Sequence, residues 1–320
     1  MKLKFGYDLS DLTAYVNEEK LPLLMAAVFS GETANTFEWQ QGIKYKEVLN
    51  YLDVDVFMRA DTGCSTFTAS GDTRLTQKEI SVDSVIHETS HCPTDLEDYW
   101  ARIGLQAGSY QDRLPFEQEW TSYYNELVKK EVELQLWRGN KSTGTGNLAL
   151  INGFLQVIDA DTAVVAANVT EGSYTQQSSI TTSNIISIIE HMVDKLPVDV
   201  EGADDLIFCV GWDTFRKALS AYRTLNNFFI DGANTSPYNS GEFFIPTWGI
   251  KMKAFRGLTT TNRIILGRTS NFVIGTDLKN DYEQYDLWYE KKDDKILTRL
   301  KYKLGTQIKF GEEMVEYTNA

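Results

Sequence analysis

Two histidines and a glutamate have the spacing of a zinc site, because residues 87–91 read His-Glu-Thr-Ser-His. In zinc metallopeptidases the pattern His-Glu-x-x-His lies on a helix, where positions i and i+4 point the same way. Both imidazoles then bind one Zn²⁺ while the glutamate acts on a metal-bound water. The chemistry to be tested is therefore peptide hydrolysis by His87, Glu88 and His91.

The neighbouring residues disfavour a helix at this motif. Pro93 biases the residue before it toward extended conformations, and residues 80–86 alternate like a strand. The candidates for a third ligand are His191, Glu117 and Glu119, and none stands at a motif spacing. We interpret the two histidines as loop or interface residues; a zinc metallopeptidase, or a structural metal site that adds Cys92, is the alternative.

A glycine-rich loop at residues 139–147 superficially suggests phosphate binding. A P-loop needs Lys-Ser or Lys-Thr directly after its last glycine. Here Lys141 and Ser142 precede Gly144, and Asn147 follows the last glycine. We therefore expect a loop that leaves a helix, with no nucleotide.

The remaining chemical candidates also have plainer explanations. No Gly-x-Ser-x-Gly nucleophile motif occurs in the sequence. Cys209 stands inside an apolar strand, which predicts an unreactive core thiol. The pair Asp204-Asp205 precedes a strand, and the pair Asp293-Asp294 occupies a predicted hairpin tip. Adjacent acids at both kinds of position are usually solvated. We expect no catalytic, cofactor-binding or metal-binding residues and no cofactor, so the chain is predicted not to be an enzyme.

Composition excludes several classes of protein. With 320 residues, 42% of them hydrophobic, the chain can bury a substantial core. Its 45 acidic and 31 basic residues give a net charge of -14, which repels phosphate backbones and anionic lipid. The longest apolar run, residues 21–29, is too short to span a membrane, and no secretory signal is expected before it. Three scattered cysteines indicate a reducing compartment.

The first half of the chain contains elements that lack a core of their own. Residues 1 to about 60 predict an extended arm, and residues 64–86 predict a polar β-hairpin that turns at Gly71-Asp72. A capping box at residues 94–97 predicts a short helix toward Gly104 or Gly108. The strongest helix is predicted after Pro115, over Phe116–Arg138, about 35 Å long. Its apolar side chains are Phe116, Trp120, Tyr123, Tyr124, Leu127, Val128, Leu134 and Trp137, and its solvated face includes Glu131 and Glu133.

The second half predicts a mixed helix and strand unit followed by strands. A helix around residues 185–193, with Ser183 as its cap, precedes a buried strand at 206–210 and a helix capped by Asp213. Strands are expected at 250–255, 263–266, 271–274, 285–289, 296–304 and 307–310, with a hairpin tip at 291–294. The predicted class is therefore α+β.

This order of elements resembles the major capsid proteins of tailed bacteriophages, whose Hong Kong 97-type fold is shared with encapsulins. The resemblance covers most of the chain, including the segment Asn-Phe-Val-Ile-Gly-Thr-Asp at 271–277 and its strand-rich continuation. It implies an N-terminal arm at 1–61, an extended loop (β-hairpin) at 62–92 and a peripheral domain at 93–180 with the spine helix 116–138. An axial domain at 181–280 and return strands of the peripheral domain at 281–320 would follow.

The resemblance implies a structural protein, a capsid subunit that self-assembles into hexamers and pentamers of an icosahedral head. That head would enclose double-stranded DNA without binding it specifically, and the arm and extended loop would join capsomers. Scaffold, portal and head-decoration proteins would be partners, no membrane would be involved, and the virion capsid would be assembled in the host cytoplasm. Lys78 is a candidate for the lysine crosslink that one type of family member forms. An encapsulin-like cellular shell is the alternative within the family.

Overall fold

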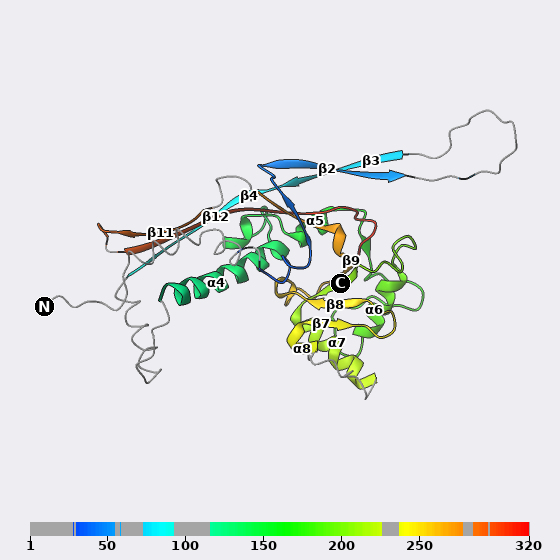
Figure 1. Cartoon of the computed structure of the whole chain (residues 1–320). Helices are drawn as coiled ribbons and strands as arrows, with labels where there is room; N and C mark the ends of the chain where they lie inside the picture. Colours follow the sequence, from blue (N-terminus) through cyan, green and yellow to red (C-terminus); the bar gives the residue numbers. More distant parts are fainter. Residues whose placement is uncertain are drawn as a thin grey trace, which may run out of the picture.

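The computed structural model describes residues 28, 30–54, 58, 73–92, 116–225, 237–277, 284–293 and 295–319. The predicted short helix after residue 94 and the predicted turn at Gly71-Asp72 lie outside these residues. The described chain combines three sheets with several helices (Figure 1), so the α+β prediction is confirmed. None of the helices in the described ranges is long and apolar enough to cross a membrane.

The spine helix α4 spans Phe116–Arg138, as predicted. Tyr124, Val128, Val132 and Leu136 recur every four residues and are buried, so one stripe of the helix faces the core. The predicted faces were partly wrong: Tyr123 and Leu127 are 59% and 43% exposed, while Glu133 is only 3% exposed. Periodicity located the helix, but its rotation depends on the elements that pack against it.

The first sheet lies along the spine helix (Figure 1). Its strand order is β1 (Glu38–Gln41), β10 (Phe272–Thr276), β12 (Lys295–Ile308) and β11 (Gln284–Glu290), and β4 (Asp83–His91) also pairs with β12. Beneath β12 lies the short helix α5 (Phe154–Ala160). We predicted two strands at 296–304 and 307–310, but β12 is continuous across Gly305. A side chain at Gly305 would collide with the carbonyl oxygen of Ser81, so this glycine permits a close backbone approach instead of a turn.

A two-stranded ribbon, β2 (Lys46–Val54) paired with β3 (Thr73–Ser81), extends beyond the first sheet (Figure 1). Residues 64–70, the predicted partner of β3 in the hairpin, lie outside the described residues. All nine residues of β3 pair with β2, which belongs to the predicted arm. The alternation of residues 80–86 predicts one strand with Ile80, Val82, Ser84 and Ile86 on one face, and this is wrong, because Ile80 and Val82 are buried but Ser84 and Ile86 are exposed. The chain leaves β2 at Val82 and joins β12, after which Val85 is buried and Ile86 exposed. A shift of one residue exchanges the two faces of a strand.

The second sheet has the order β5 (Val165–Ala166), β13 (Val315–Tyr317), β9 (Ile264–Arg268), β6 (Leu206–Val210), β8 (Lys251–Ala254) and β7 (Glu242–Phe244). Helices α6 (Ile185–Asp194) and α7 (Trp212–Leu225) pack on it, and the four-residue α8 (Pro237–Ser240) precedes β7. The predicted helix, strand and helix are therefore confirmed. The two sheets do not follow the predicted domain bounds. Strand β10 lies in the predicted axial domain (181–280) but belongs to the first sheet, and β13 lies in the predicted peripheral strands (281–320) but belongs to the second.

The two predicted helix caps are wrong. The N-cap of α6 is Asn184, whose side-chain oxygen accepts the amide of Thr181, and not Ser183. Asp213 lies in the first turn of α7, where its carboxylate accepts the amide of Thr260 across the domain. The Ser183 hydroxyl instead lies 2.9 Å from the hydroxyl of Thr181, so each predicted cap residue uses its side chain in another contact.

Two hydrophobic cores meet at β6. Ile207 and Cys209 belong to the core beneath the first sheet and α4, whereas Leu206, Phe208 and Val210 face α6 and α7. All five residues of this strand are buried, which explains its continuous apolar sequence. The strand therefore holds the two parts of the molecule together.

Candidate functional site

The His-Glu-x-x-His segment forms most of strand β4, so the prediction that it is not helical is confirmed. The two histidines lie in this strand and not in a loop. His87 lies opposite Leu300 and His91 opposite Ile296 in the antiparallel pairing with β12. Four residues of strand span about 13 Å, whereas two histidine nitrogens on one zinc each lie about 2.1 Å from it. Glu88 points to the other face of the strand, since neighbouring side chains alternate. The segment therefore does not present its three side chains to one metal ion.

His87 and Glu88 make contacts that position strand β4. The His87 ring stacks on Tyr124 of the spine helix, with ring centres 5.5 Å apart. Burial lowers the pKa of both His87 and His91, which favours neutral imidazoles. Glu88 Oε1 accepts a hydrogen bond from Arg299 Nε at 2.7 Å, joining β4 to β12. These contacts hold strand β4 against β12 of the first sheet and against helix α4.

The other candidate ligands are scattered. His191 stacks on Tyr174 in the second core, with ring centres 4.0 Å apart, and Cys92 is exposed at the end of β4. Burial raises the pKa of the Cys209 thiol, as expected for an unreactive core cysteine. The side chains of Glu117 and Glu119 lie outside the described residues. Among the described residues no group of three or more histidine, cysteine or acidic side chains is placed to hold a metal ion.

The glycine-rich loop and the acidic pairs also serve local structure. Asn140 Oδ1 accepts the amides of Ser142 and Thr143, so the loop forms its turn with its own side chain. Asp205 accepts hydrogen bonds from Arg268 and Ser270. Asp204 and Asp293 are exposed, and Asp294 lies outside the described residues.

A buried polar network, which the sequence did not reveal, fixes the segment before β1 to the spine helix. Glu133 accepts hydrogen bonds from the Thr33 amide at 2.8 Å and from the Thr33 hydroxyl at 2.5 Å. Trp137 Nε1 donates to the same hydroxyl oxygen at 2.7 Å. Burial raises the pKa of Glu133, and the two bonds from Thr33 oppose that rise. A side chain at Gly31 would collide with this carboxylate, so the glycine allows the chain to pass close to the helix.

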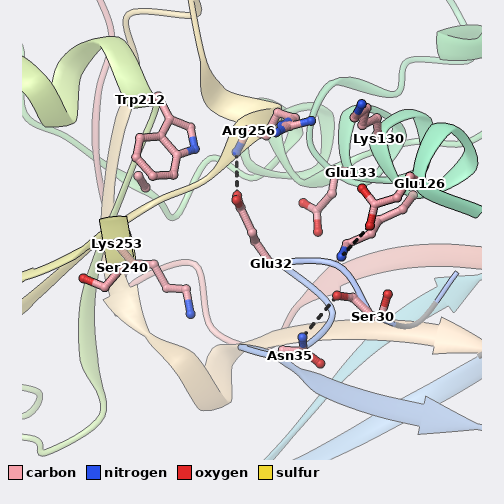
Figure 2. A pocket seen from close by; sticks show the side chains of 12 residues that line it. Ser30, Glu32, Asn35, Glu126, Lys130, Glu133, Trp212, Ser240, Lys253 and Arg256 are labelled. Atoms are coloured by element: carbon pink, nitrogen blue, oxygen red, sulfur yellow. Dashed lines mark hydrogen bonds and ion pairs between the residues drawn. The ribbon is translucent and has the colours of Figure 1, made fainter. Parts of the chain in front are cut away.

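Beside this network lies a pocket of about 310 Å³ where the arm, α4 and the second sheet meet (Figure 2). Most of its charged groups already have partners. Glu32 Oε2 accepts the amide of Arg256 at 3.0 Å, Glu126 pairs with Lys129, and Lys253 pairs with Glu242. The bond between Glu32 and Arg256 joins the segment before β1 to the turn after β8, while the other two pairs lie within α4 and within the second sheet. The pocket is therefore lined by groups that serve the structure.

The ribbon is held at its root by two lysines. Lys303 Nζ lies 2.6 Å from the buried carboxylate of Asp277 and donates to the carbonyl oxygen of Lys44, just before β2. Lys78 on β3 pairs with Asp161 at 2.5 Å, beside the end of α5. The lysine considered for a crosslink is thus engaged within its own subunit. Farther along β2 the side chains are mostly exposed, including Val48, and Tyr45 at the root is 70% exposed.

The geometry therefore shows no assembled catalytic group in the described chain, but a body of two cores with a ribbon anchored at one end. No protein-family model matches the sequence, and no curated protein sequence matches it. Solved structures, in contrast, match it over nearly its whole length.

A chain of the satellite phage P4 procapsid with the size determination (Sid) protein is 12% identical, with a TM-score of 0.60 over 95% of this chain and 99% of that one. The capsid of cyanophage A-1(L) is 10% identical, with a TM-score of 0.56 over 93% and 92% of the two chains. A virus-like particle from Pyrococcus furiosus is 10% identical, with a TM-score of 0.51 over 97% and 98%. At these identities the likeness establishes the fold, and the chain has the Hong Kong 97-type fold.

Proposed function

We propose that the chain is a structural shell subunit, the major capsid protein of a tailed bacteriophage head that encloses double-stranded DNA. The observation that carries this proposal is the extent of the structural likeness. It covers 95% of this chain and 99% of the phage P4 procapsid chain, so no large part of either chain is left for another task.

The physical properties of the molecule support self-assembly. A two-stranded ribbon is marginally stable in water, and β2 exposes nearly all of its first five side chains. A neighbouring subunit would supply the surface that this ribbon lacks. The net charge of -14 suits a container that must not bind its packaged DNA tightly.

Under this proposal the copies form hexamers and pentamers, and the arm (1–61) and extended loop (62–92) contact neighbouring capsomers. Residues 93–180 and 281–320 would form the peripheral domain and residues 181–280 the axial domain. The observed ribbon adds β2 to the extended loop. Scaffold, portal and decoration proteins would be the other partners, and the virion would be the site of action.

An encapsulin-like cellular shell is the second candidate, favoured by the likeness to the Pyrococcus furiosus particle over 97% of this chain. Both candidates predict particles, so their contents must separate them. The phage P4 and cyanophage structures have the higher TM-scores, 0.60 and 0.56 against 0.51, and for this reason we favour the phage head.

The test is electron microscopy of the purified full chain, with sedimentation to measure the fraction in large particles. Shells, tubes or rings of capsomers are expected. A chain that stays monomeric at every concentration and salt would contradict the proposal. Portal and terminase genes next to its own gene would support the phage head, whereas a neighbouring gene for an enzyme packaged inside the particle would support the cellular shell.

A further inference from the structure

A groove with an acidic rim lies at one end of the second sheet, where β6 and β8 begin. Its apolar lining includes Leu196, Phe244, Trp248 and Ile250, and its acidic lining includes Asp194, Glu201, Asp204 and Asp205. Phe244 is 61% exposed although it is a large aromatic side chain. A monomer gains nothing from such exposure, so the groove has the composition of a contact surface.

Most of the acidic charge in the groove is not neutralised by the domain itself. Asp205 pairs with Arg268 at 2.9 Å, whereas Asp194, Glu201 and Asp204 are exposed and form no ion pair with any described residue. The two lysines of the groove, Lys251 and Lys253, are both held by Glu242, at 2.6 and 2.7 Å. The groove therefore carries a net negative charge. A surface that binds to it by charge complementarity would be positive.

Helix α7 of the same domain presents a surface of that kind. Arg216, Ser220 and Arg223 are exposed and share one face, since they are four and seven residues apart. The two arginines stand about 10 Å apart along the helix and form no ion pair within the described chain. Leu225, at the end of the helix, is 64% exposed and adds an apolar contact. None of these residues lines the groove, so one subunit can use both surfaces at once.

We propose that the groove of one subunit binds the basic face of α7 from a second copy of this chain. The proposal rests on the shell function above and adds which two faces meet and by which chemistry. Arg216 and Arg223 pair with the acids of the rim, and apolar side chains from α7 cover Phe244. Because the two faces differ, the contact is head-to-tail, and repeated copies close into a ring if the rotation allows.

Charge reversal and rescue in the purified full chain test this pairing. The groove variant is D194K/E201K/D204K, the helix variant is R216E/R223E, and a third chain combines all five changes. Glu190→Lys, an exposed change on α6 outside the groove lining, is the control. The measurements are the assembled fraction by sedimentation, electron micrographs, and circular dichroism as a check on folding.

Each reversed variant should lower the assembled fraction about tenfold, the equivalent of about 1.4 kcal/mol, and the combined variant should recover most of it. The control should assemble like the wild type. Unchanged assembly in both reversed variants, or loss in both without recovery in the combined chain, overturns the inference while the shell function stands. A wild-type chain that never associates contradicts both.

Should a reversal prevent folding, neutral variants replace it. The wild type should associate less at about 0.5 M salt than at about 0.05 M, because exposed charge pairs are screened. D194N/E201Q/D204N and R216Q/R223Q should each remove most of that salt dependence. A salt dependence that persists in both neutral variants overturns the pairing.

Discussion

The ribbon β2–β3 and the central strand β6 differ in how far their side chains are buried within the subunit. All five side chains of β6 are buried between two cores, whereas the first five residues of β2 are exposed except for the partly buried Leu49. The strand β6 is stabilised by its own subunit. The ribbon is held at its root by two lysines and by a small apolar cluster that includes Ile80 and Val82, and farther along β2 its side chains are exposed. Under the proposed function a neighbouring subunit covers that exposed part. Mutations should therefore affect monomer stability at β6 and assembly at the ribbon.

The largest effect is expected at the centre of β6. Phe208 is fully buried in the second core, and Phe208→Ala leaves a cavity that should lower the free energy of unfolding by about 3–5 kcal/mol. Chemical denaturation of the dissociated subunit measures this. Phe208→Leu should cost much less, and a loss below about 1 kcal/mol for the alanine variant would show that this core is looser than the structure indicates.

The next effect is expected where the arm joins the spine helix. Thr33→Val removes the hydroxyl that donates to Glu133 and accepts from Trp137, leaving buried polar atoms without that partner. The expected loss is about 1–3 kcal/mol, measured by the same denaturation. Thr33→Ser keeps the hydroxyl and should retain most of the stability. Equal losses in both variants would show that the methyl group, and not the hydrogen bonds, matters here.

A pH effect is expected at β13, the second strand of the second sheet. Burial raises the pKa of Glu316 on β13 to about 7, although Arg263 at 2.7 Å opposes the rise and Asp159 adds to it. Because the folded pKa exceeds the ordinary 4.5, the folded state takes up a proton. The contribution to stability is complete below about pH 4.5 and is lost as the pH rises through about 7, by an amount on the order of 1–2 kcal/mol.

Melting temperatures of the wild type and of Glu316→Gln across pH 5 to 8 measure this contribution. The wild type should lose stability over that range relative to the variant, which cannot ionise there. Parallel curves for the two proteins would show that Glu316 does not titrate in this window.

The smallest effect on the subunit itself is expected on the ribbon. Val48 is exposed on β2, so Val48→Ser should change the free energy of unfolding by less than about 0.5 kcal/mol. Under the proposed function it should still reduce the assembled fraction, because a neighbouring subunit would cover this face. Unaltered assembly would argue that this part of the ribbon contacts no neighbour.

Several features could be predicted from sequence alone because they depend on near neighbours in the chain. The bounds of α4 follow from its apolar repeat, with Pro115 before it and Gly139 after it. The absence of a helix at His87 and His91 follows from the alternation of residues 80–86 and from Pro93, and this was enough to reject a helical zinc motif. The buried strand β6 follows from its continuous apolar run.

Other features were decided by the tertiary structure because they depend on contacts between distant residues. The pairing of β2 with β3, the change of face at Val82 and the burial of Glu133 against Thr33 leave no local pattern. The continuity of β12 through Gly305 depends on Ser81, more than two hundred residues earlier, and the acidic groove gathers residues from α6, β7 and β8. Periodicity reports which side chains share a face, but only packing decides what that face meets.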